Sequence, residues 1–355
     1  MAARATIYDV AARAGVSIAT VSRVLNEPAK VQESTRAAVL AVMRELGFVP
    51  RAEAVARART RFRRIAVLVP FFTEPSFSQR LRGVSDALSA ASHELVIYAV
   101  KSQAALEEYV DLVCAPDRVD GVILISLKLP GRSLDCLRKS GLPCVFIEAG
   151  VEGFDAVAVD NRQGGRMAAR WLLELGFRRV AFVGEHSSQP FAVNSTDERL
   201  QGFLEVFEEQ GVAVDERLVH VAEYPKGAGF AHGDLEAELA AVIGDEPRPE
   251  AIFATSDLIA ARLAKIANGM GLSVPRDLAL LGFDDVDLAE YLGLSTISQA
   301  LDESGRLAAS MLLERIERPD SPPRTSIIGL EIVRRGSVPQ ALGQKGETKA
   351  EGGLK

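Results

Sequence analysis

The feature that most constrains the fold of this chain is an alternation of short apolar runs with helix-length amphipathic stretches, which starts at Ile65. Each run is rich in branched apolar residues and is bounded by turn residues, as is typical of buried parallel strands. The stretches between the runs are long enough to form crossover helices, so the pattern predicts doubly wound α/β units. The predicted strands are residues 65–69, 95–98, 122–125, 144–147, 157–159, 180–183, 251–254 and 278–283.

These strands form two sets over about 275 residues, which predicts two parallel sheets and therefore a body of two lobes. Ligands of such folds bind beyond the carboxyl ends of the strands. The polar residues that directly follow each strand are therefore the candidates for ligand contact.

The composition fits a soluble globular protein and excludes other classes. Hydrophobic residues make up 48% of the chain and charged residues 25%, which excludes wholesale disorder. No apolar run approaches the ~20 residues that span a bilayer, so we expect no membrane partner. The three cysteines form no CxxC motif and favour a reducing cytosol, so we expect a cytoplasmic protein.

Charge is distributed unevenly along the chain. Residues 1–64 carry a net charge of +7, and the remaining residues carry −14. A small basic head on a larger acidic body predicts that the head meets a polyanion. A solvated arm is the alternative, but the head also has apolar residues at helical spacing, which a solvated arm does not need.

The head has the pattern of three short helices. Residues 6–9 form a capping box that starts a first helix, and Gly15 ends it. Ser17 can cap a second helix over 18–25, and a third is predicted over about 34–46. This is the helix-turn-helix arrangement, whose second helix enters the major groove of DNA. A small helical docking domain is the alternative.

The outward face of the predicted second helix carries side chains that suit DNA. Ile18 and Ala19 can touch a thymine methyl, and Arg23 can donate two hydrogen bonds to a guanine edge, so we expect these three to read bases. Short polar side chains suit phosphate oxygens, which fix the register of a protein on DNA. The expected contacts to the DNA backbone are Thr6, Ser17, Thr20, Ser22, Asn26 and Thr35.

Residues 6–26, TIYDVAARAGVSIATVSRVLN, closely resemble the head of the lactose/galactose-repressor family of bacterial transcription regulators. The resemblance continues through Pro50 and covers almost the whole chain to about residue 340. It implies a homodimer or a higher oligomer on a palindromic double-stranded DNA operator. It also implies a small-molecule effector in the cleft between two periplasmic-binding-protein-like lobes, with the chain crossing between the lobes more than once.

The resemblance and the strand pattern together imply the domain boundaries. The expected parts are a DNA-binding domain at 1–49, a hinge at 50–64, a first lobe at about 65–158 and 290–323, a second lobe at about 159–289 and 324–340, and a disordered tail at 341–355.

The hinge departs from the family pattern. In the family this segment is a helix that inserts a leucine into the minor groove, and the matching position here is Arg57, in an arginine-rich stretch. A guanidinium cannot unstack a base step as an apolar wedge does, although a narrow A·T minor groove attracts it. We expect Val55 and Arg57 at the minor groove, with little kinking and a steep salt dependence. A shifted register with Val55 as a weak wedge is the alternative.

Residue by residue, the resemblance places ligand contacts at Asp160, Ser195, Arg199, Asp257 and Asp284. Carboxylates and a guanidinium suit a polyhydroxylated ligand, because each hydroxyl both donates and accepts a hydrogen bond, so we expect a sugar effector. As alternatives, Asp257 and Asp285 could be helix N-caps, and phenylalanines near strand ends are often core residues. The candidates to stack on a sugar ring are Phe72, Phe77, Phe191 and Phe283.

The sequence has no catalytic motif of a known class, and its four histidines lie far apart, so we expect no enzyme, no metal site and no cofactor. The expected function is a DNA-binding transcriptional repressor whose operator affinity depends on the effector. The alternatives are a purine or nucleoside effector, a two-lobed solute-binding sensor, and a sugar-active enzyme with Asp284 and Asp285 as a catalytic pair.

Overall fold

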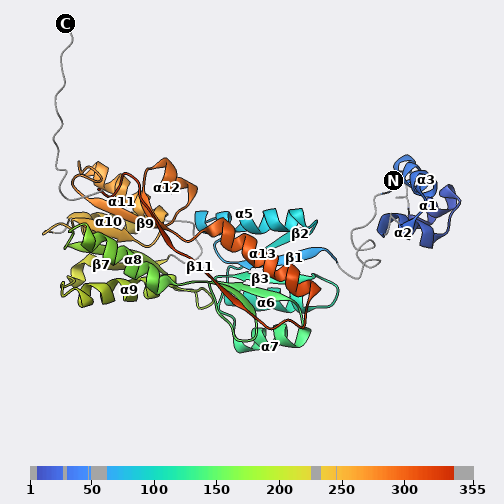
Figure 1. Cartoon of the computed structure of the whole chain (residues 1–355), viewed down its shortest axis with the longest axis horizontal. Coiled ribbons are helices and arrows are strands. Elements are labelled where there is room, and N and C mark those ends of the chain that lie inside the picture. The colour runs from blue at the N-terminus through green and yellow to red at the C-terminus, as the bar shows by residue number, and fades with distance from the viewer. Residues whose placement is uncertain are drawn as a thin grey trace, which may run out of the picture.

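The computed structural model of the chain consists of a small helical head and two α/β lobes (Figure 1). No helix in the part that it describes is long and apolar enough to cross a membrane. The described residues are 6–26, 30–46, 48, 62–224, 233–244 and 246–339.

The head contains the three predicted helices, α1 (Ile7–Ala14), α2 (Ile18–Asn26) and α3 (Glu33–Glu45). The predicted capping box is present, because Thr6 N donates to Asp9 Oδ2 at 2.7 Å and Asp9 N donates to the Thr6 hydroxyl at 3.4 Å. The predicted helix-turn-helix arrangement is therefore confirmed. Its core consists of Val10, Ala11, Val21, Val24, Val39 and Met43.

The first lobe is built on a six-stranded sheet in the order β11-β5-β4-β3-β1-β2, and all its neighbouring strands are parallel. One face is covered by α5 (Pro75–Ala90) and α13 (Leu301–Glu317), and the other by α6 (Gln103–Cys114) and α7 (Gly131–Ser140). The strands are β1 (Arg64–Val69), β2 (Glu94–Ala99), β3 (Gly121–Ile125), β4 (Cys144–Ile147), β5 (Asp155–Val159) and β11 (Thr325–Ile328).

The second lobe repeats this plan in the order β12-β10-β9-β8-β6-β7, with only β12 antiparallel to its neighbour among these strands. Helices α8 (Asn161–Glu174) and α9 (Ser195–Glu209) cover one face, and α10 (Gly233–Gly244) and α11 (Asp257–Gly269) the other. The short α12 (Asp287–Tyr291) follows β9. The strands are β6 (Val180–Ser187), β7 (Val219–Tyr224), β8 (Ala251–Ala254), β9 (Ala279–Asp284), β10 (Ser295–Ser298) and β12 (Glu331–Val333).

All eight predicted strands are present, and the fold class is confirmed, but two predicted lobe boundaries are wrong. The chain leaves the first lobe after β5, as expected. It returns at residues 299–300 rather than near 290, because β10 pairs with β9. It crosses again at residues 329–330 rather than near 324, because β11 pairs with β5. β10 and β11 are short and rich in polar residues, so no apolar run marks them, and their strand partners decide to which lobe they belong. The predicted tail lies outside the described residues.

Each lobe contains a helix pair that is held close by glycines. A Cβ on Gly165 of α8 would lie 1.9 Å from the carbonyl oxygen of Arg199 in α9. In the first lobe, a Cβ on Gly305 of α13 would lie 2.0 Å from the carbonyl oxygen of Arg80 in α5. Arg80 and Arg199 each begin the sequence Arg-Leu-X-Gly, so the two lobes place an arginine at equivalent positions.

Candidate functional site

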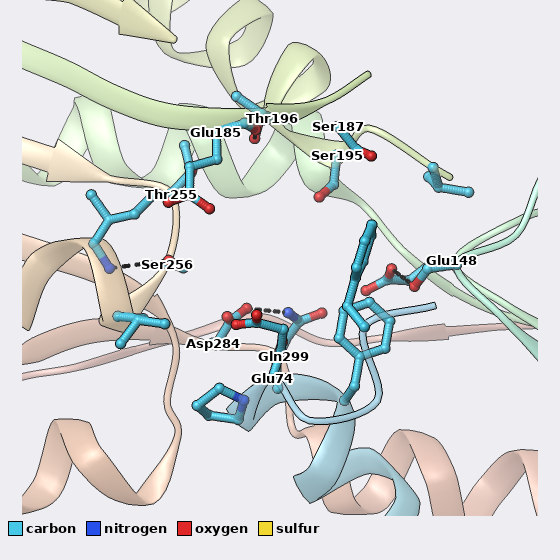
Figure 2. A pocket seen from close by; sticks show the side chains of 18 of the residues that line it. Glu74, Glu148, Glu185, Ser187, Ser195, Thr196, Thr255, Ser256, Asp284 and Gln299 are labelled. Atoms are coloured by element: carbon cyan, nitrogen blue, oxygen red, sulfur yellow. Dashed lines mark hydrogen bonds between the residues drawn. The ribbon is translucent and has the colours of Figure 1, made fainter. Parts of the chain in front are cut away.

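A pocket lies between the two lobes at the carboxyl ends of their strands, where the sequence predicted a ligand site (Figure 2). Ser126 and Glu148 directly follow β3 and β4 of the first lobe. Glu185 belongs to the end of β6, and Asp284 is the last residue of β9, both in the second lobe. Since both sheets place these ends at the pocket, a molecule bound there touches both lobes.

The half of the pocket formed by the first lobe is organised by Arg80. Its side chain is buried, its Nε donates to the Ser304 hydroxyl at 2.9 Å, and its Nη2 donates to Glu148 Oε1 at 2.9 Å. The Ser126 hydroxyl donates to the other carboxylate oxygen of Glu148. Burial by itself raises the pKa of Glu148, but Arg80 and Ser126 outweigh it and hold this pKa below its ordinary value. Glu148 is therefore an ionised hydrogen-bond acceptor.

The half formed by the second lobe is organised by Arg199, which is 4% exposed. Its Nε donates to Asn161 Oδ1 at 3.0 Å, and its Nη1 donates to the Thr255 carbonyl at 2.5 Å. The guanidinium carbon lies 3.6 Å from the centre of the Phe283 ring, which is a close cation–π contact. These contacts fix the guanidinium as a rigid donor at the wall of the pocket.

Asp284 and Gln299 connect the two halves (Figure 2). Gln299 Nε2 donates to Asp284 Oδ1, while Gln299 Oε1 accepts from Arg80 Nη2 at 3.1 Å. Burial raises the pKa of Asp284 to about 6, although the nearby Arg199 acts in the opposite direction. Gln299 lies where the chain crosses between the lobes, and its amide bonds both to Arg80 of the first lobe and to Asp284 of the second.

The backbone is strained at several positions on this pocket. The φ angles are 45° at Phe71, 51° at Ser126, 68° at Glu148 and 111° at Asp284. The left-handed region costs a residue with a side chain on the order of 1–3 kcal/mol, and such strain concentrates at functional sites. Ser126, Glu148 and Asp284 are polar residues at strand ends that line the pocket, so this strain makes the pocket a candidate binding site.

The head offers a second surface, formed by α2. Ile18 is 42% exposed, and Ala19 and Arg23 are also exposed. The Ser17 hydroxyl accepts from Thr20 N at 3.1 Å and thus caps α2, as predicted. The exposed start of the helix combines small, apolar and basic side chains, a combination that can enter a major groove.

Comparison with known proteins identifies the whole arrangement. Residues 6–51 match the family described as bacterial regulatory proteins, lacI family. Residues 157–338 match the periplasmic binding protein-like domain. The HTH-type transcriptional repressor PurR of Proteus mirabilis is 30% identical over 340 residues, with 94% of this chain and 97% of that protein aligned. This chain belongs to the lacI family. The expected family resemblance is confirmed, and the chain is a DNA-binding transcriptional repressor with an effector domain and not an enzyme.

Other relatives of this lacI-family regulator cover most of its length. The ribose operon repressor of Halalkalibacterium halodurans is 32% identical over 316 residues, which are 88% of this chain and 91% of that protein. Among solved structures, the complex of the transcriptional regulator CelR with cellobiose is 30% identical to this chain, with a TM-score of 0.66. The alignment covers 94% of this chain and 100% of that chain. The lac repressor dimer bound to operator and an anti-inducer shares the fold at 21% identity and a TM-score of 0.77, covering 94% and 99%.

The structure brings four of the predicted effector contacts of this regulator to the pocket, namely Phe77, Ser195, Arg199 and Asp284. Phe77 comes from α5, Ser195 and Arg199 both come from α9, and Asp284 is the last residue of β9. Their role as ligand contacts remains a prediction, but their placement around one pocket supports it.

Asp160 and Asp257 do not line the pocket, which contradicts their predicted placement. Asp160 caps α8, where it accepts from Gln163 N at 2.8 Å. Asp257 is fully buried, and its carboxylate accepts from the Thr296 hydroxyl at 2.5 Å and from Val286 N at 2.9 Å. Burial, with a smaller contribution from Asp284, raises the pKa of Asp257 to about 8. The cap of α11 is the neighbouring Ser256, so the alternative of Asp257 as an N-cap is also wrong.

Of the four phenylalanine candidates, one lines the pocket and the others do not. Phe283 is fully buried in the core and meets Arg199 from behind the pocket wall. Phe191 is packed in the core of the first lobe. Phe72 is 40% exposed and does not line the pocket, so only Phe77 of the four is on its wall. Aromatic side chains near strand ends serve packing unless the backbone turns them outward.

Sequence reasoning missed Arg80, Ser126, Glu148 and Gln299, although two signals for them were present. Ser126 and Glu148 directly follow predicted strands, so the rule that selected Asp284 also selects them. Arg80 begins the same Arg-Leu-X-Gly sequence as Arg199. Nothing in the sequence distinguishes Gln299, which lies at the crossing.

Several predictions for the head and hinge lie beyond what the structure describes. The side chain of Asn26 is outside the described residues, as are Val55 and Arg57. Thr6, Thr20, Ser22 and Thr35 lie in described helices or at their ends, and their contacts to DNA remain predictions. In the described part of the chain, no group of three or more His, Cys, Asp or Glu side chains could hold a metal ion.

Proposed function

We propose that this lacI-family regulator binds a palindromic operator as a homodimer and that a sugar bound in the interlobe pocket changes its operator affinity. The observation that carries the proposal is the arrangement of two arginines and two carboxylates from opposite lobes around one pocket. Arg80 and Glu148 supply one pair, and Arg199 and Asp284 the other. A polyhydroxylated ligand both donates to the carboxylates and accepts from the guanidinium groups.

The aromatic and amide groups of the pocket favour a sugar over a purine. Phe71 and Phe77 meet edge to face, with ring planes at 72°, rather than as a parallel pair that would enclose a flat base. The amide of Asn194 bonds to both the nitrogen and the carbonyl of Ser187, at 3.0 and 3.2 Å. The Gln299 amide is also occupied. The relatives named for a ribose operon and for cellobiose point in the same direction.

The effector can act on DNA only if it and the operator prefer different lobe arrangements, and the coupling is then reciprocal. Dimerisation places two α2 helices about one helical turn of DNA apart, ~34 Å, or a multiple of it. Ile18, Ala19 and Arg23 read bases, and the Arg57 hinge adds contacts at the minor groove. The solved dimer on operator DNA supports the dimeric arrangement. DNA as the partner places the regulator in the cytoplasm.

The test starts from operator sequences selected from random duplexes by the full-length protein. Fluorescence anisotropy then measures affinity near physiological salt, with and without each of a panel of sugars. We expect a palindromic consensus and at least one sugar that shifts the affinity. Loss of that shift in Arg199→Ala, with operator affinity kept, assigns the effect to the pocket. A protein that prefers no duplex over random competitor would contradict the proposal.

A further inference from the structure

We propose that strand β3 transmits changes at the interlobe pocket to the point where the DNA-binding head joins the first lobe, and that Asp120 is the positioning residue at this point. The inference rests on the proposed function, since it names how the same pocket regulates operator binding. It follows from the contacts at the two ends of β3 and from the way the strand is held between them.

Asp120 directly precedes β3 and holds the start of the first lobe. Its Oδ1 accepts from Phe62 N at 2.8 Å, and its Oδ2 accepts from Arg64 N at 3.0 Å. Arg63 between them has a φ of 53°, and a left-handed turn of this kind directs successive N–H groups toward one anion. Hydrogen bonds to a carboxylate are stronger than those between neutral groups. One side chain therefore fixes the backbone at the end of the expected hinge, residues 50–64.

Backbone hydrogen bonds hold the same junction, residues 62–64, against two strands of the sheet. Glu94 N, at the start of β2, donates to the Arg63 carbonyl at 2.6 Å, and Asp120 N donates to the Arg64 carbonyl at 2.8 Å. The backbone and the carboxylate of Asp120 thus both bond to the junction. A displacement of the start of β3 therefore displaces the junction as well.

The other end of β3 is bonded to a segment of the second lobe. This segment, residues 191–193 between β6 and α9, is called the strap below. Lys128 N donates to the Phe191 carbonyl at 2.7 Å, and Val193 N donates to the Ser126 carbonyl at 3.0 Å. Phe191 is 1% exposed and packs in the core of the first lobe. The strap therefore fastens the second lobe to the residues that directly follow β3.

The strap also borders the effector pocket. Val193 lines the pocket together with the next two residues along the chain, Asn194 and Ser195. Ser126 lines it from the first lobe, and its hydroxyl donates to Glu148. A ligand that changes how the two lobes meet at this place therefore acts on the carboxyl end of β3.

The strand between these two ends is rigid. All five residues of β3 are buried, and the strand pairs with β1 on one edge and with β4 on the other. Close-packed interiors transmit strain instead of absorbing it. At 3.3 Å per residue, Asp120 and Ser126 lie about 20 Å apart, one at the junction and one at the pocket. Coupling over such a distance requires a packed element that both sites act on, and β3 meets this requirement.

The first experiment measures operator affinity without and with an active sugar, by fluorescence anisotropy with the full-length protein. Asp120→Asn keeps the shape of the side chain but places an NH2 group opposite one of the two backbone N–H groups. We expect this variant to bind the sugar as the wild type does in isothermal titration. The ratio of the two operator affinities should, however, fall to within about twofold of one.

Asp117→Asn is the matched control, since Asp117 is exposed in the turn before β3, and it should keep the wild-type ratio. Asp120→Ser, which leaves a single acceptor, replaces Asp120→Asn if the latter does not fold. A wild-type ratio in the Asp120 variant would overturn the proposal.

The second experiment needs no sugar, because it tests the two ends of β3 against each other. Phe191→Leu loosens the strap and keeps most of the core volume, and Phe191→Ala loosens it further. Operator affinities of these variants, alone and combined with Asp120→Asn, complete two double-mutant cycles. Independent sites this far apart combine additively to within about twofold in affinity. We expect a deviation from additivity of at least about fivefold.

Phe154→Leu is the control for the strap, because Phe154 packs against the same core, with its ring centre 5.4 Å from that of Phe146, and lies outside the strap. Its cycle with Asp120→Asn should be additive. Additive cycles for both Phe191 variants, or Phe191 variants that leave operator affinity unchanged, would overturn the proposal.

The two proposals fail separately. If no sugar changes the operator affinity of the wild type, the sugar effector is contradicted, and the sugar-free cycles still decide on β3. If the wild type and Asp120→Asn respond equally to a sugar, transmission through Asp120 is wrong and the proposed function stands. Hydrogen exchange at the Phe62 and Arg64 amides should be faster in Asp120→Asn than in the wild type. Unchanged exchange would contradict the role of Asp120 at the junction.

Discussion

Gln299 donates a hydrogen bond to the Asp284 carboxylate, and this contact joins the crossing between the lobes to the last residue of β9. The same amide accepts from Arg80 of the first lobe. Only 2% of the surface of Gln299 is exposed, so both of these bonds are buried. One buried side chain thus connects Arg80 of the first lobe to Asp284 of the second at the wall of the pocket.

Gln299→Ala should destabilise the protein by about 1–3 kcal/mol, because it removes one hydrogen bond from the buried Asp284 carboxylate and one from the buried Arg80 guanidinium. Urea unfolding at pH 7 measures the change. The control is Gln201→Ala, since Gln201 is exposed on α9. Gln299→Ala, unlike the control, should also alter the effector-induced shift in operator affinity. Equal stability of the two variants would show that the Gln299 contacts contribute nothing net.

Gly165→Ala should be strongly destabilising, because the new Cβ would lie 1.9 Å from a backbone oxygen that cannot move away without separating α8 from α9. Overpacking of this kind costs about 1–3 kcal/mol or more. Gly269→Ala is the matched control, since nothing lies within 4 Å of its Cβ position at the end of α11. That change should be neutral or should stabilise by up to about 1 kcal/mol. Thermal unfolding of both variants measures the two effects. A Gly165→Ala variant as stable as the wild type would contradict the close packing of α8 against α9.

Asp257→Asn should stabilise the protein at pH 9. The pKa of Asp257 is raised to about 8 in the folded state, so the native protein holds a proton that the unfolded chain releases from about pH 4 upward. The contribution of Asp257 to the free energy of unfolding therefore falls as the pH rises from about 4 to about 8. The loss is about 1.4 kcal/mol for each unit by which the folded and unfolded pKa values differ. The amide keeps the shape and removes the titration.

Unfolding of Asp257→Asn in urea at pH 5, 7 and 9 should show a flatter stability profile than that of the wild type. Asp135→Asn, on the surface of α7, is the control and should follow the wild-type profile. A variant that loses the same stability at every pH would mean that the hydrogen bonds of Asp257, and not its charge, dominate.

Arg23→Ala should weaken operator binding by about 1–3 kcal/mol and relax the base preference at one position of each half-site. Arg23 is exposed on α2, so the head should remain folded. Anisotropy with operators substituted at single positions measures the relaxation. Arg118→Ala removes the same charge from the first lobe and should leave affinity and preference intact. If Arg23→Ala weakened binding equally for all operator sequences, Arg23 would contact a phosphate and not a base.

Arg57→Leu should strengthen operator binding and increase the bend of the DNA, because an apolar side chain can wedge into a base step where a guanidinium cannot. Anisotropy and a bend assay on circularly permuted fragments measure the two effects. Arg59→Leu, two residues away, is the control for loss of charge. Abolished binding in Arg57→Leu would contradict the interpretation of the hinge as a purely electrostatic contact.

The head and the strands of the lobes were predictable because their signals are local. The Thr6 cap, Gly15 and the apolar spacing of the head act over one or two helical turns. Buried strands such as β3 and β4 show themselves as continuous apolar runs. In both cases neighbouring residues in the chain carry all the information that the element needs.

The site required the tertiary structure, because its geometry depends on contacts between distant segments. Asp160 follows β5 and Asp284 ends β9, yet Asp160 caps a helix and Asp284 lines the pocket with a φ of 111°. The two later crossings are set by the pairing of β10 with β9 and of β11 with β5, and the second of these pairings joins segments far apart in the sequence. The sequence alone thus determined the helices of the head, eight of the described strands and the family of the chain, but not β7, β10, β11 or β12. Only the folded chain decided which strand-end side chains meet, because that choice depends on sheet register and on packing between the lobes.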